Sequence, residues 1–215
     1  MKIKDSGTLT VKLVDNNNSP LPDIKIKLYN QQSPIYDVKS NLINLYGSIL
    51  DDGKTDNNGV VNFGELNAGT YYIEADTPKV NGVKYHPQKA FQVIANHSKK
   101  ITINVEEYTG TLQMLFLNLT NLTPFQDLTV LLVPSENYIS NSTIDNYTTL
   151  AEYNTTTDAS GYVTFKLPSD RFFYVIVYPA DKSFQQYYLI VVSKDETYKN
   201  TFIVSPNNIQ PMYSK

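Results

Sequence analysis

Two histidines are the side chains of this sequence best suited to acid–base or metal chemistry: His86, in Lys84-Tyr-His-Pro87, and His97, in an Asn/Ser-rich turn. Neither belongs to a spaced ligand motif of the kind that a zinc site uses. The sequence also lacks a Gly-x-Ser-x-Gly elbow, a phosphate loop and a dinucleotide fingerprint. Its zero cysteines exclude disulfides, thiolate metal sites and a cysteine nucleophile. These residues predict a protein that is not an enzyme and that needs no cofactor.

Acidic side chains gather at one further point, where Asp51, Asp52, Asp56 and Asn57 offer oxygens that a calcium ion would accept. Their spacing does not follow the alternating Asp/Asn-Gly pattern of a calcium-binding loop. We therefore expect an ordinary turn here and no metal site.

Sequons for N-glycosylation are unusually dense. Five crowd into the start of the second half and two lie in turns of the first; the acceptors are Asn17, Asn96, Asn118, Asn121, Asn141, Asn146 and Asn154. Asn121 is the weakest of them because Pro124 follows its threonine. The cluster predicts covalent N-glycans on the surface, provided that the chain reaches a glycosyltransferase.

Tyrosine offers a second way to meet sugars, since the chain has 17 tyrosines and no tryptophan. The pairs Tyr71-Tyr72 and Tyr187-Tyr188 carry rings on which a sugar could stack. Adjacent residues of a strand point to opposite faces, however. We therefore expect one tyrosine of each pair to lie in a core.

Composition narrows the class of protein. The 215 residues are 41% hydrophobic with a net charge of −3, which is typical of a globular chain. Arg171 is the one arginine, so the forked contacts that read nucleic acid are scarce and we expect no nucleic-acid partner. No signal peptide is visible at the start, and no apolar run is long enough to span a membrane.

A duplicated pattern sets the domain organisation. Asp56, Gly59 and Phe63 return as Asp158, Gly161 and Phe165, at one constant offset of 102 residues. A constant offset across matched positions indicates a repeated unit. We predict one domain over residues 1–107, a second over 108–205 and a tail over 206–215. The linker between the domains is so short that we expect them to hold a nearly fixed relation.

Period-two alternation predicts strands throughout, and hence an all-β fold. In the first domain the expected strands are 7–15, 24–28, 60–66, 70–76, 90–95 and 101–106, with a hairpin at 96–99 and an uncertain strand or short helix at 42–50. In the second domain they are 111–119, 128–133, 162–167, 172–178, 187–193 and 198–204. The expected core residues are Leu9, Val11, Leu13, Ile24, Ile26, Phe63, Ile103 and Phe165.

The two domains differ in their outward positions. Those of the first are polar, at Thr10, Lys12, Lys25 and Lys27. Several strands of the second are apolar on both faces and need cover on the side away from the core. The residues concerned are Leu115, Leu117, Leu131, Val133 and Ile176. That cover is either the chain itself, through the first domain or the 134–156 loop, or another subunit that makes the protein an oligomer.

Three sequence motifs of the first domain follow the pattern of a known family of domains. They are Gly7-x-Leu-x-Val-x-Leu-x-Asp15, Pro20-Leu-Pro-Asp-Ile24, and Thr55-Asp-x-x-Gly59 followed by Phe63 and Gly69-Thr-Tyr71. They resemble the prealbumin-like sandwich, which includes carboxypeptidase regulatory-like and Cna-B-type domains. The second domain matches this pattern more loosely. The resemblance implies two tandem Greek-key β-sandwiches that serve as a stalk, spacer or adhesive building block.

Some Cna-B-type domains also form an internal isopeptide between a first-strand lysine and a last-strand Asn or Asp, beside a catalytic glutamate. The family spacing places that lysine at Leu13 and that glutamate at Ala75. Lys12, Glu74 and Asn104 lie near these positions, but a shift of one residue reverses the face of a strand. We therefore expect solvent-facing polar residues here and no isopeptide.

The preferred functional hypothesis is a non-enzymatic structural protein of an extracellular assembly. Such an assembly is a virion tail, ring or appendage, or a surface filament, in which the chain packs with copies of itself or with other structural proteins. The alternative is a glycan-binding or adhesion module of a cell-surface protein.

Overall fold

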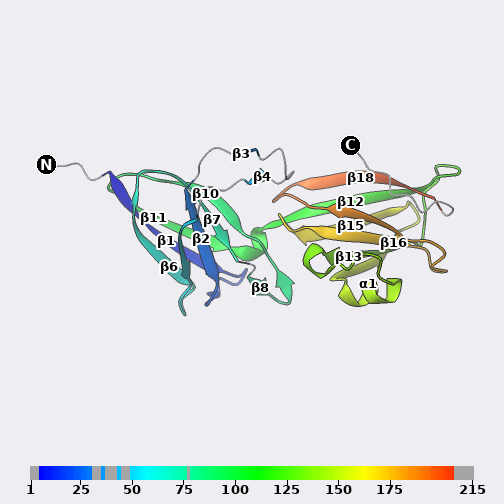
Figure 1. The fold of residues 1–215 in the computed structure, drawn as a ribbon, viewed down its shortest axis with the longest axis horizontal. Helices are drawn as coiled ribbons and strands as arrows, with labels where there is room; N and C mark the ends of the chain where they lie inside the picture. The colour runs from blue at the N-terminus through cyan, green and yellow to red at the C-terminus, as the bar shows by residue number, and fades with distance from the viewer. Residues whose placement is uncertain (1–4, 31–34, 37–42, 45–48, 77, 206–215) are drawn as a thin grey trace. The chain divides into compact units, whose positions relative to one another are not determined.

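The computed structural model describes residues 5–30, 35–36, 43–44, 49–76 and 78–205. The chain divides into two compact units, Met1–Tyr108 and Thr109–Lys215, so the division falls one residue from the predicted boundary. Each unit is a sandwich of two β-sheets (Figure 1), as the alternation of the sequence predicted. The tail over 206–215 and most of the uncertain element at 42–50 lie outside the described residues.

The first unit packs a three-stranded sheet of order β11-β1-β6 on a four-stranded sheet of order β10-β7-β2-β5. The strands are β1 (Ser6–Val14), β2 (Lys25–Asn30), β5 (Ile49–Lys54), β6 (Val60–Asn67), β7 (Gly69–Ala75), β10 (Gln88–Val93) and β11 (Ser98–Asn104). Two short antiparallel strand pairs, β3 (Ile35–Tyr36) with β4 (Ile43–Asn44) and β8 (Lys79–Val80) with β9 (Val83–Lys84), and a 3-10 turn over Val105–Glu107 are also present among the described residues.

The second unit repeats this plan with sheets of order β15-β12-β18 and β14-β13-β16-β17. Its strands are β12 (Thr109–Asn118), β13 (Thr129–Pro134), β14 (Tyr153–Thr156), β15 (Tyr162–Pro168), β16 (Phe173–Tyr178), β17 (Gln186–Ile190) and β18 (Thr197–Val204). A 3-10 turn over Ser135–Asn137 and the helix α1 (Ile144–Leu150) lie between β13 and β14.

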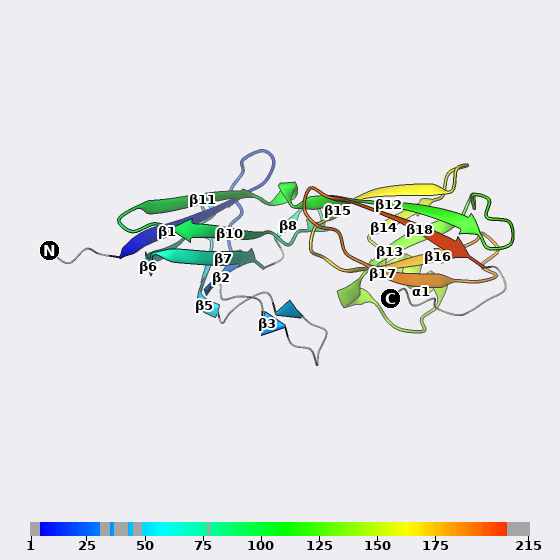
Figure 2. The ribbon, with the colours of Figure 1, turned by 90° about the horizontal axis from the view of Figure 1, so that it is seen from above.

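The first strand of each unit is the centre of its three-stranded sheet. β1 pairs antiparallel with β6 and parallel with β11, from Thr8 opposite Ser98 to Val14 opposite Asn104. β12 pairs in the same way with β15 and β18, and Figure 2 shows β12 and β18 running side by side in one direction. Each unit is therefore closed by a pairing between its first and its last strand.

The duplicated residues occupy equivalent places. The Asp56 carboxylate accepts the backbone N–H groups of Asn58 (2.8 Å) and Val60 (2.9 Å), and so fixes the turn into β6. Asp158 accepts those of Ser160 and Tyr162, both at 2.9 Å, and so fixes the turn into β15. These bonds confirm that the aspartates form turns, as predicted, because the accepting oxygen is held by the backbone of its own loop.

Glycine is required in both copies of this turn. Gly59 has φ 72° and Gly161 has φ 75°, in the left-handed region where a side chain is strained. A Cβ on Gly59 would lie 2.5 Å from the Leu13 carbonyl oxygen, and one on Gly161 would lie 2.6 Å from that of Phe116. The repeat therefore preserves a close approach between this turn and the central strand.

A buried threonine precedes each of these aspartates. Thr157 Oγ1 donates to the Phe125 carbonyl oxygen at 2.7 Å and accepts the Leu128 N–H at 3.0 Å. In the first unit, Thr55 makes the same two bonds at the same two distances, to Leu21 and Ile24. Each hydroxyl thus ties the turn to the segment that leads into β13 or β2.

The predicted core is confirmed. Leu9, Val11 and Leu13 are fully buried, as period-two alternation on a one-sided strand requires. Ile26, Phe63, Ile103 and Phe165 are also buried, while Ile24 is half-buried against the same cluster.

Two predictions about the end of the first unit are wrong. Residues 96–99 do not form a hairpin, because β10 pairs with β7 in one sheet whereas β11 pairs with β1 in the other. The turn crosses between the sheets instead. β11 ends at Asn104, whose side chain accepts the Glu106 N–H and so begins the 3-10 turn. The predicted strand to residue 106 is therefore two residues too long, although Val105 is buried as expected.

Candidate functional site

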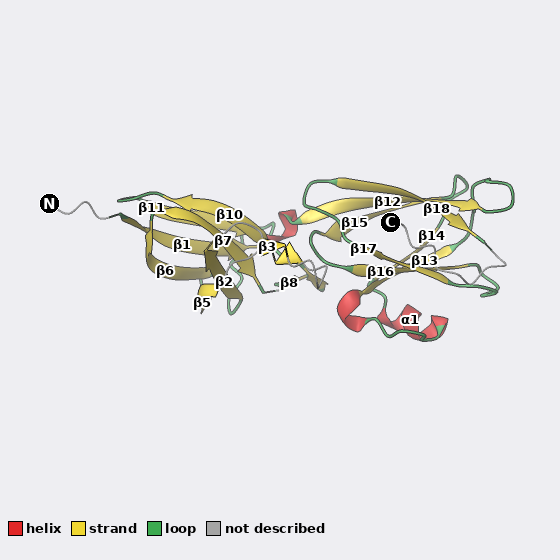
Figure 3. Cartoon of the chain, turned by 45° about the horizontal axis from the view of Figure 1, so that its top comes forward, coloured by secondary structure: helices red, strands yellow, loops and turns green. Residues whose placement is uncertain are grey.

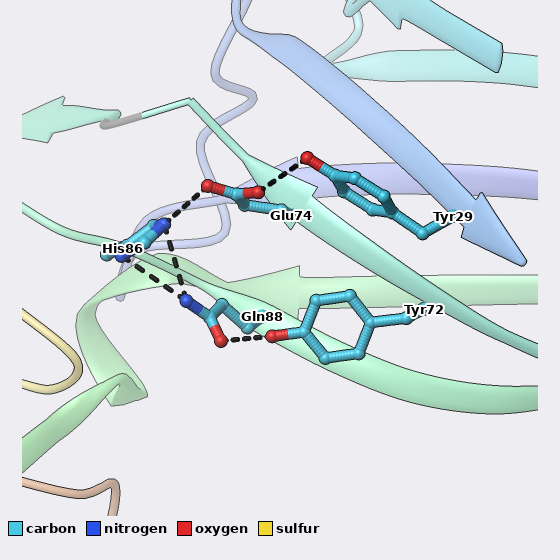
Figure 4. Close-up of polar contacts among 5 residues, drawn as sticks. All are labelled: Tyr29, Tyr72, Glu74, His86 and Gln88. Carbon is cyan, nitrogen blue, oxygen red and sulfur yellow. Dashed lines mark hydrogen bonds and ion pairs between the residues drawn. The ribbon is translucent and has the colours of Figure 1, made fainter. Parts of the chain in front are cut away.

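A polar cluster lies on the outer face of the four-stranded sheet of the first unit (Figure 4). Glu74 of β7 contacts the His86 Nε2 at 2.7 Å through one oxygen and accepts the Tyr29 hydroxyl at 2.9 Å through the other. Gln88 lies 3.3 Å from both His86 nitrogens and accepts the Tyr72 hydroxyl. The cluster thus joins β2, β7 and the entry to β10.

The contact with His86 lowers the pKa of Glu74; burial opposes this shift, and the bond from Tyr29 adds to it. Glu74 is therefore a carboxylate at neutral pH. A carboxylate beside an imidazole can hold or move a proton, but both Glu74 oxygens are already occupied, one by Tyr29 of β2 and the other by His86, which precedes β10. The arrangement is that of a structural hydrogen-bond network that links β2, β7 and the segment before β10.

In the sequence, His86 lies outside any spaced ligand motif, and no pattern there indicated its contact with Glu74. The β8–β9 hairpin separates the two residues along the chain, and the pairing of β7 with β10 brings them together, with Gln88 opposite Glu74. The other histidine, His97, lies exposed in its turn and contacts the Ala95 carbonyl oxygen at 2.8 Å.

The acidic residues considered for calcium are not gathered around a common point. Asp52 forms an ion pair with Lys25 at 2.9 Å, while Asp56 holds its own turn. Within the described ranges, no group of three or more His, Asp or Glu side chains is placed to hold a metal ion.

The side chains near the isopeptide positions do not converge either. Leu13 and Ala75 are buried in the core, and Ile103 lies opposite Leu13 in the register. Lys12 is on the outer face of the three-stranded sheet, whereas Glu74 is on the outer face of the other sheet. Buried apolar side chains therefore occupy the positions that the family spacing assigns to the crosslink.

A local cover conceals three of the five apolar residues considered for an interface. Leu131, Val133 and Ile176 are fully buried beneath the segment that carries α1, where Tyr147 is also buried. Figure 3 shows α1 lying against the side of the sheet that β13 and β16 form. The internal cover, which was the alternative considered from the sequence, accounts for these three residues without a partner subunit.

Arg171 forms ion pairs with one glutamate before α1 and one after it. Its guanidinium contacts Glu152, just after α1, at 2.7 Å and Glu136, before α1, at 2.6 Å. It also lies 5.1 Å from the centre of the Phe173 ring. The single arginine is therefore a structural residue that is 7% exposed.

Leu115 and Leu117 lie on the outer face of the other sheet, where they remain half-exposed. In the register, Leu115 lies between Tyr162 and Thr201, and Leu117 lies beside Ile203. A shallow depression of about 460 Å³ opens here, lined by Gln113, Leu115, Tyr162, Lys199, Asn200 and Thr201. We call the patch formed by Leu115, Leu117, Tyr162 and Ile203 the apolar face.

The equivalent surface of the first unit is polar, as predicted. Thr10 and Lys12 of β1 lie there, with Lys100 and Thr102 of β11 opposite them in the register. Lys25 and Lys27 likewise point outward from β2. The two units therefore share one fold but present different surfaces on their three-stranded sheets.

The tyrosine pairs divide as expected. Tyr71 is buried in the first core and Tyr188 packs against the second, while Tyr187 is 44% exposed. The sequons also divide: Asn17, Asn96, Asn121, Asn141 and Asn154 are exposed, whereas Asn118 and Asn146 are half-buried. In the part of the chain that the structure describes, no helix has the length and apolar character needed to cross a membrane.

The topology of both units is that of a Greek-key β-sandwich whose first strand lies between its last strand and a middle strand. Residues 7–109 match the family model of the SpaA prealbumin-like fold domain. The first unit is thus a prealbumin-like domain, as the resemblance implied, and the second repeats its strand order.

Several solved structures are similar to the chain. The Bacillus anthracis TIE protein has a TM-score of 0.43 and 19% identity, with 92% of this chain and 34% of that chain covered. A minor pilin of Streptococcus agalactiae has a TM-score of 0.41 and 17% identity over 97% and 100%. A streptococcal ancillary pilin has a TM-score of 0.39 and 16% identity over 92% and 62%. This chain thus spans about a third of the first protein and less than two thirds of the third. No curated protein matches the chain significantly.

Proposed function

We propose that the chain is a non-enzymatic, load-bearing structural module of an extracellular surface appendage, such as a pilus-like filament or stalk. The observation that carries this proposal is the parallel pairing of first and last strands in both units. The prealbumin-like identity of the first unit supports it. The prealbumin-like identity of the first unit lends no support to the virion component that was considered from the sequence.

The physical argument concerns the direction of load. A pull on both ends of the first unit acts at the Ser6 end of β1 and at the Asn104 end of β11, which are opposite ends of one parallel ladder. Evenly spaced bonds of a parallel ladder are then sheared together and not opened one by one. The second unit has the same geometry, from Thr111 opposite Thr197 to Asn118 opposite Val204.

Single-molecule pulling tests this proposal, and the absence of native cysteines makes engineered cysteine handles unambiguous. Handles at Asp5→Cys and Glu107→Cys load the β1–β11 ladder in shear. Handles at Asp5→Cys and His97→Cys load the same ladder from one end, because Thr8 and Ser98 are register partners. All three positions are exposed.

We expect the shear geometry to unfold at a markedly higher force, because forced unfolding follows the unfolding rate under load. Equal forces in the two geometries would contradict a load-bearing role. A glycan-binding or adhesion module, the alternative function, makes no demand on this ratio of forces.

We further propose that like subunits or other appendage proteins pack on the apolar face of the second unit. Leu115 and Leu117 are half-exposed there, beside Tyr162, which is 39% exposed. Burying such a surface against a partner is favourable in proportion to the apolar area removed from water. Native mass measurement tests this assembly: a monodisperse monomer at high concentration contradicts it.

A further inference from the structure

A glycosyltransferase needs a sequon that is exposed and that lies in an irregular segment of backbone. The seven sequons differ in these two conditions. Asn141 meets both conditions: it lies in the turn between the 3-10 turn Ser135–Asn137 and α1, with φ 58°, and it is exposed. Its sequon hydroxyl, on Thr143, is exposed as well. Thr143 Oγ1 accepts the Asn146 N–H at 3.2 Å, which leaves its own proton available to donate.

Four other sequons have specific obstacles. Asn118 and Asn146 are half-buried, and the Asn146 amide nitrogen donates to Ser142 Oγ at 2.5 Å. Proline follows the hydroxyl residue in the sequons of Asn17 and Asn121, at Pro20 and Pro124 respectively. The Asn121 side-chain oxygen also accepts the N–H and the hydroxyl of its own Thr123.

The remaining two sequons are exposed but lie wholly or partly within strands. Asn154 lies within β14, opposite Leu131 in the register. Asn96 is in a turn, yet its sequon residue Ser98 begins β11, and the Ser98 hydroxyl accepts that of Thr8 at 3.0 Å. Asn141 is thus the one exposed sequon asparagine of the described chain whose whole sequon lies outside strands and helices and is not followed by proline.

We propose that Asn141 is an N-glycan acceptor of this protein. The co-reactant is a sugar linked through phosphate or pyrophosphate to a polyprenol, and a glycosyltransferase supplies the base. The Asn141 amide nitrogen bonds to the anomeric carbon as the bond from that carbon to the phosphate oxygen breaks. The polyprenol phosphate leaves with the bonding electron pair and the amide nitrogen loses one proton to the base, so no oxidant or reductant is needed.

The position of Asn141 gives the second unit two different sides. The glycan is attached at the end of the α1 cover, on the outer side of the sheet formed by β14, β13, β16 and β17. The apolar face belongs to the other sheet of the same sandwich. A sugar at Asn141 therefore does not obstruct the apolar face, and it keeps the α1 side in water. This modification does not depend on the load-bearing role proposed above.

The test uses protein purified from the organism that makes it, with peptide mapping across residue 141. Threonine 143 allows a sharp comparison because it caps α1 and also completes the sequon. Thr143→Asp retains a good helix cap and destroys the sequon, whereas Thr143→Ser retains both. Asn141→Gln removes the acceptor, and Asn137→Gln is the matched control, since Asn137 is exposed in the same segment but lies outside any sequon.

We expect hexose-scale added mass at residue 141 in the wild-type chain, in Thr143→Ser and in Asn137→Gln. We expect that mass to be lost in Asn141→Gln and in Thr143→Asp, with the protein still folded. An unmodified Asn141 in the wild-type protein overturns the proposal, and so does added mass on this peptide that Asn141→Gln leaves unchanged.

Discussion

Replacing Thr157 by valine removes a hydroxyl from a buried site while keeping nearly the same volume. The lost hydroxyl leaves the Phe125 carbonyl oxygen and the Leu128 N–H without the partner that they have at 2.7 and 3.0 Å. Thr157 is 2% exposed, so water cannot replace the hydroxyl without a rearrangement of the turn.

The magnitude follows from these two groups. Each buried donor or acceptor left unsatisfied costs about 1–3 kcal/mol. The methyl group that replaces the hydroxyl contributes roughly 1 kcal/mol in the opposite direction. We therefore expect Thr157→Val to lower the unfolding free energy of the second unit by about 1–5 kcal/mol, with about 3 kcal/mol as the central value. Thr157→Ser keeps both bonds and loses a single methyl group, for a cost of about 1 kcal/mol.

Hydrogen exchange followed by mass spectrometry is the suitable assay, because it reports the opening free energy of each unit within the intact chain. Thr55→Val is the matched experiment in the first unit, where the hydroxyl makes the same two bonds. Thr164→Val, at an exposed position of β15, is the control for the valine itself. If Thr157→Val costs no more than Thr157→Ser, the hydroxyl does not hold the turn and the reasoning fails.

Four further outcomes follow from the packing and the polar cluster. Phe165→Ala should lower the unfolding free energy by about 3–5 kcal/mol in denaturant titrations, because the ring is buried; a loss below about 1 kcal/mol contradicts its place in the core. Leu131→Lys should unfold the second unit, seen by circular dichroism, since it buries an unpaired charge beneath α1. Leu117→Lys should leave both units folded and reduce the mass of any oligomer in native mass spectrometry; an unchanged oligomer excludes this face. The pKa of Glu74 is lower in the folded protein than in the unfolded chain. The stabilisation by its carboxylate is therefore present above the unfolded pKa of about 4.3 and is lost as the pH falls through the folded pKa. Glu74→Gln should accordingly reduce the loss of first-unit unfolding free energy at acid pH, measured by denaturant titration at a series of pH values.

Much of the fold was predictable because strand periodicity is a local property. Leu9, Val11 and Leu13 alternate with polar residues, and only one face of such a strand can be buried. The repeated Asp and Gly were equally informative, since a turn that needs both an accepting carboxylate and a positive φ leaves few choices of residue. The burial of Thr55 and Thr157 was not predictable, because a buried threonine looks like an ordinary polar residue in a sequence.

The remaining features depend on contacts that sequence spacing does not encode. The helix α1 is seven residues long and contains Asn, Tyr and two Thr, all poor helix formers. Two tertiary interactions hold α1 in place: its packing over Leu131, and the contacts of Arg171 with Glu152 and Glu136 on either side of it. The contact between Glu74 and His86 similarly depends on how β7 and β10 pair. The need for cover over Leu131 was visible in the sequence, but the identity of the cover was not.

The pairing of first and last strands also sets the order in which the protein can fold during synthesis. Thr8 and Ser98 face each other although 90 residues separate them along the chain. A ribosome must therefore release nearly the whole first unit before β1 has both of its neighbours, and folding that depends on such distant contacts is slow. In that interval β1 has an open edge that could pair with another chain. Lysine on an exposed strand opposes such pairing, so Lys12, on the outer face of β1, would help to keep nascent chains apart until β11 arrives.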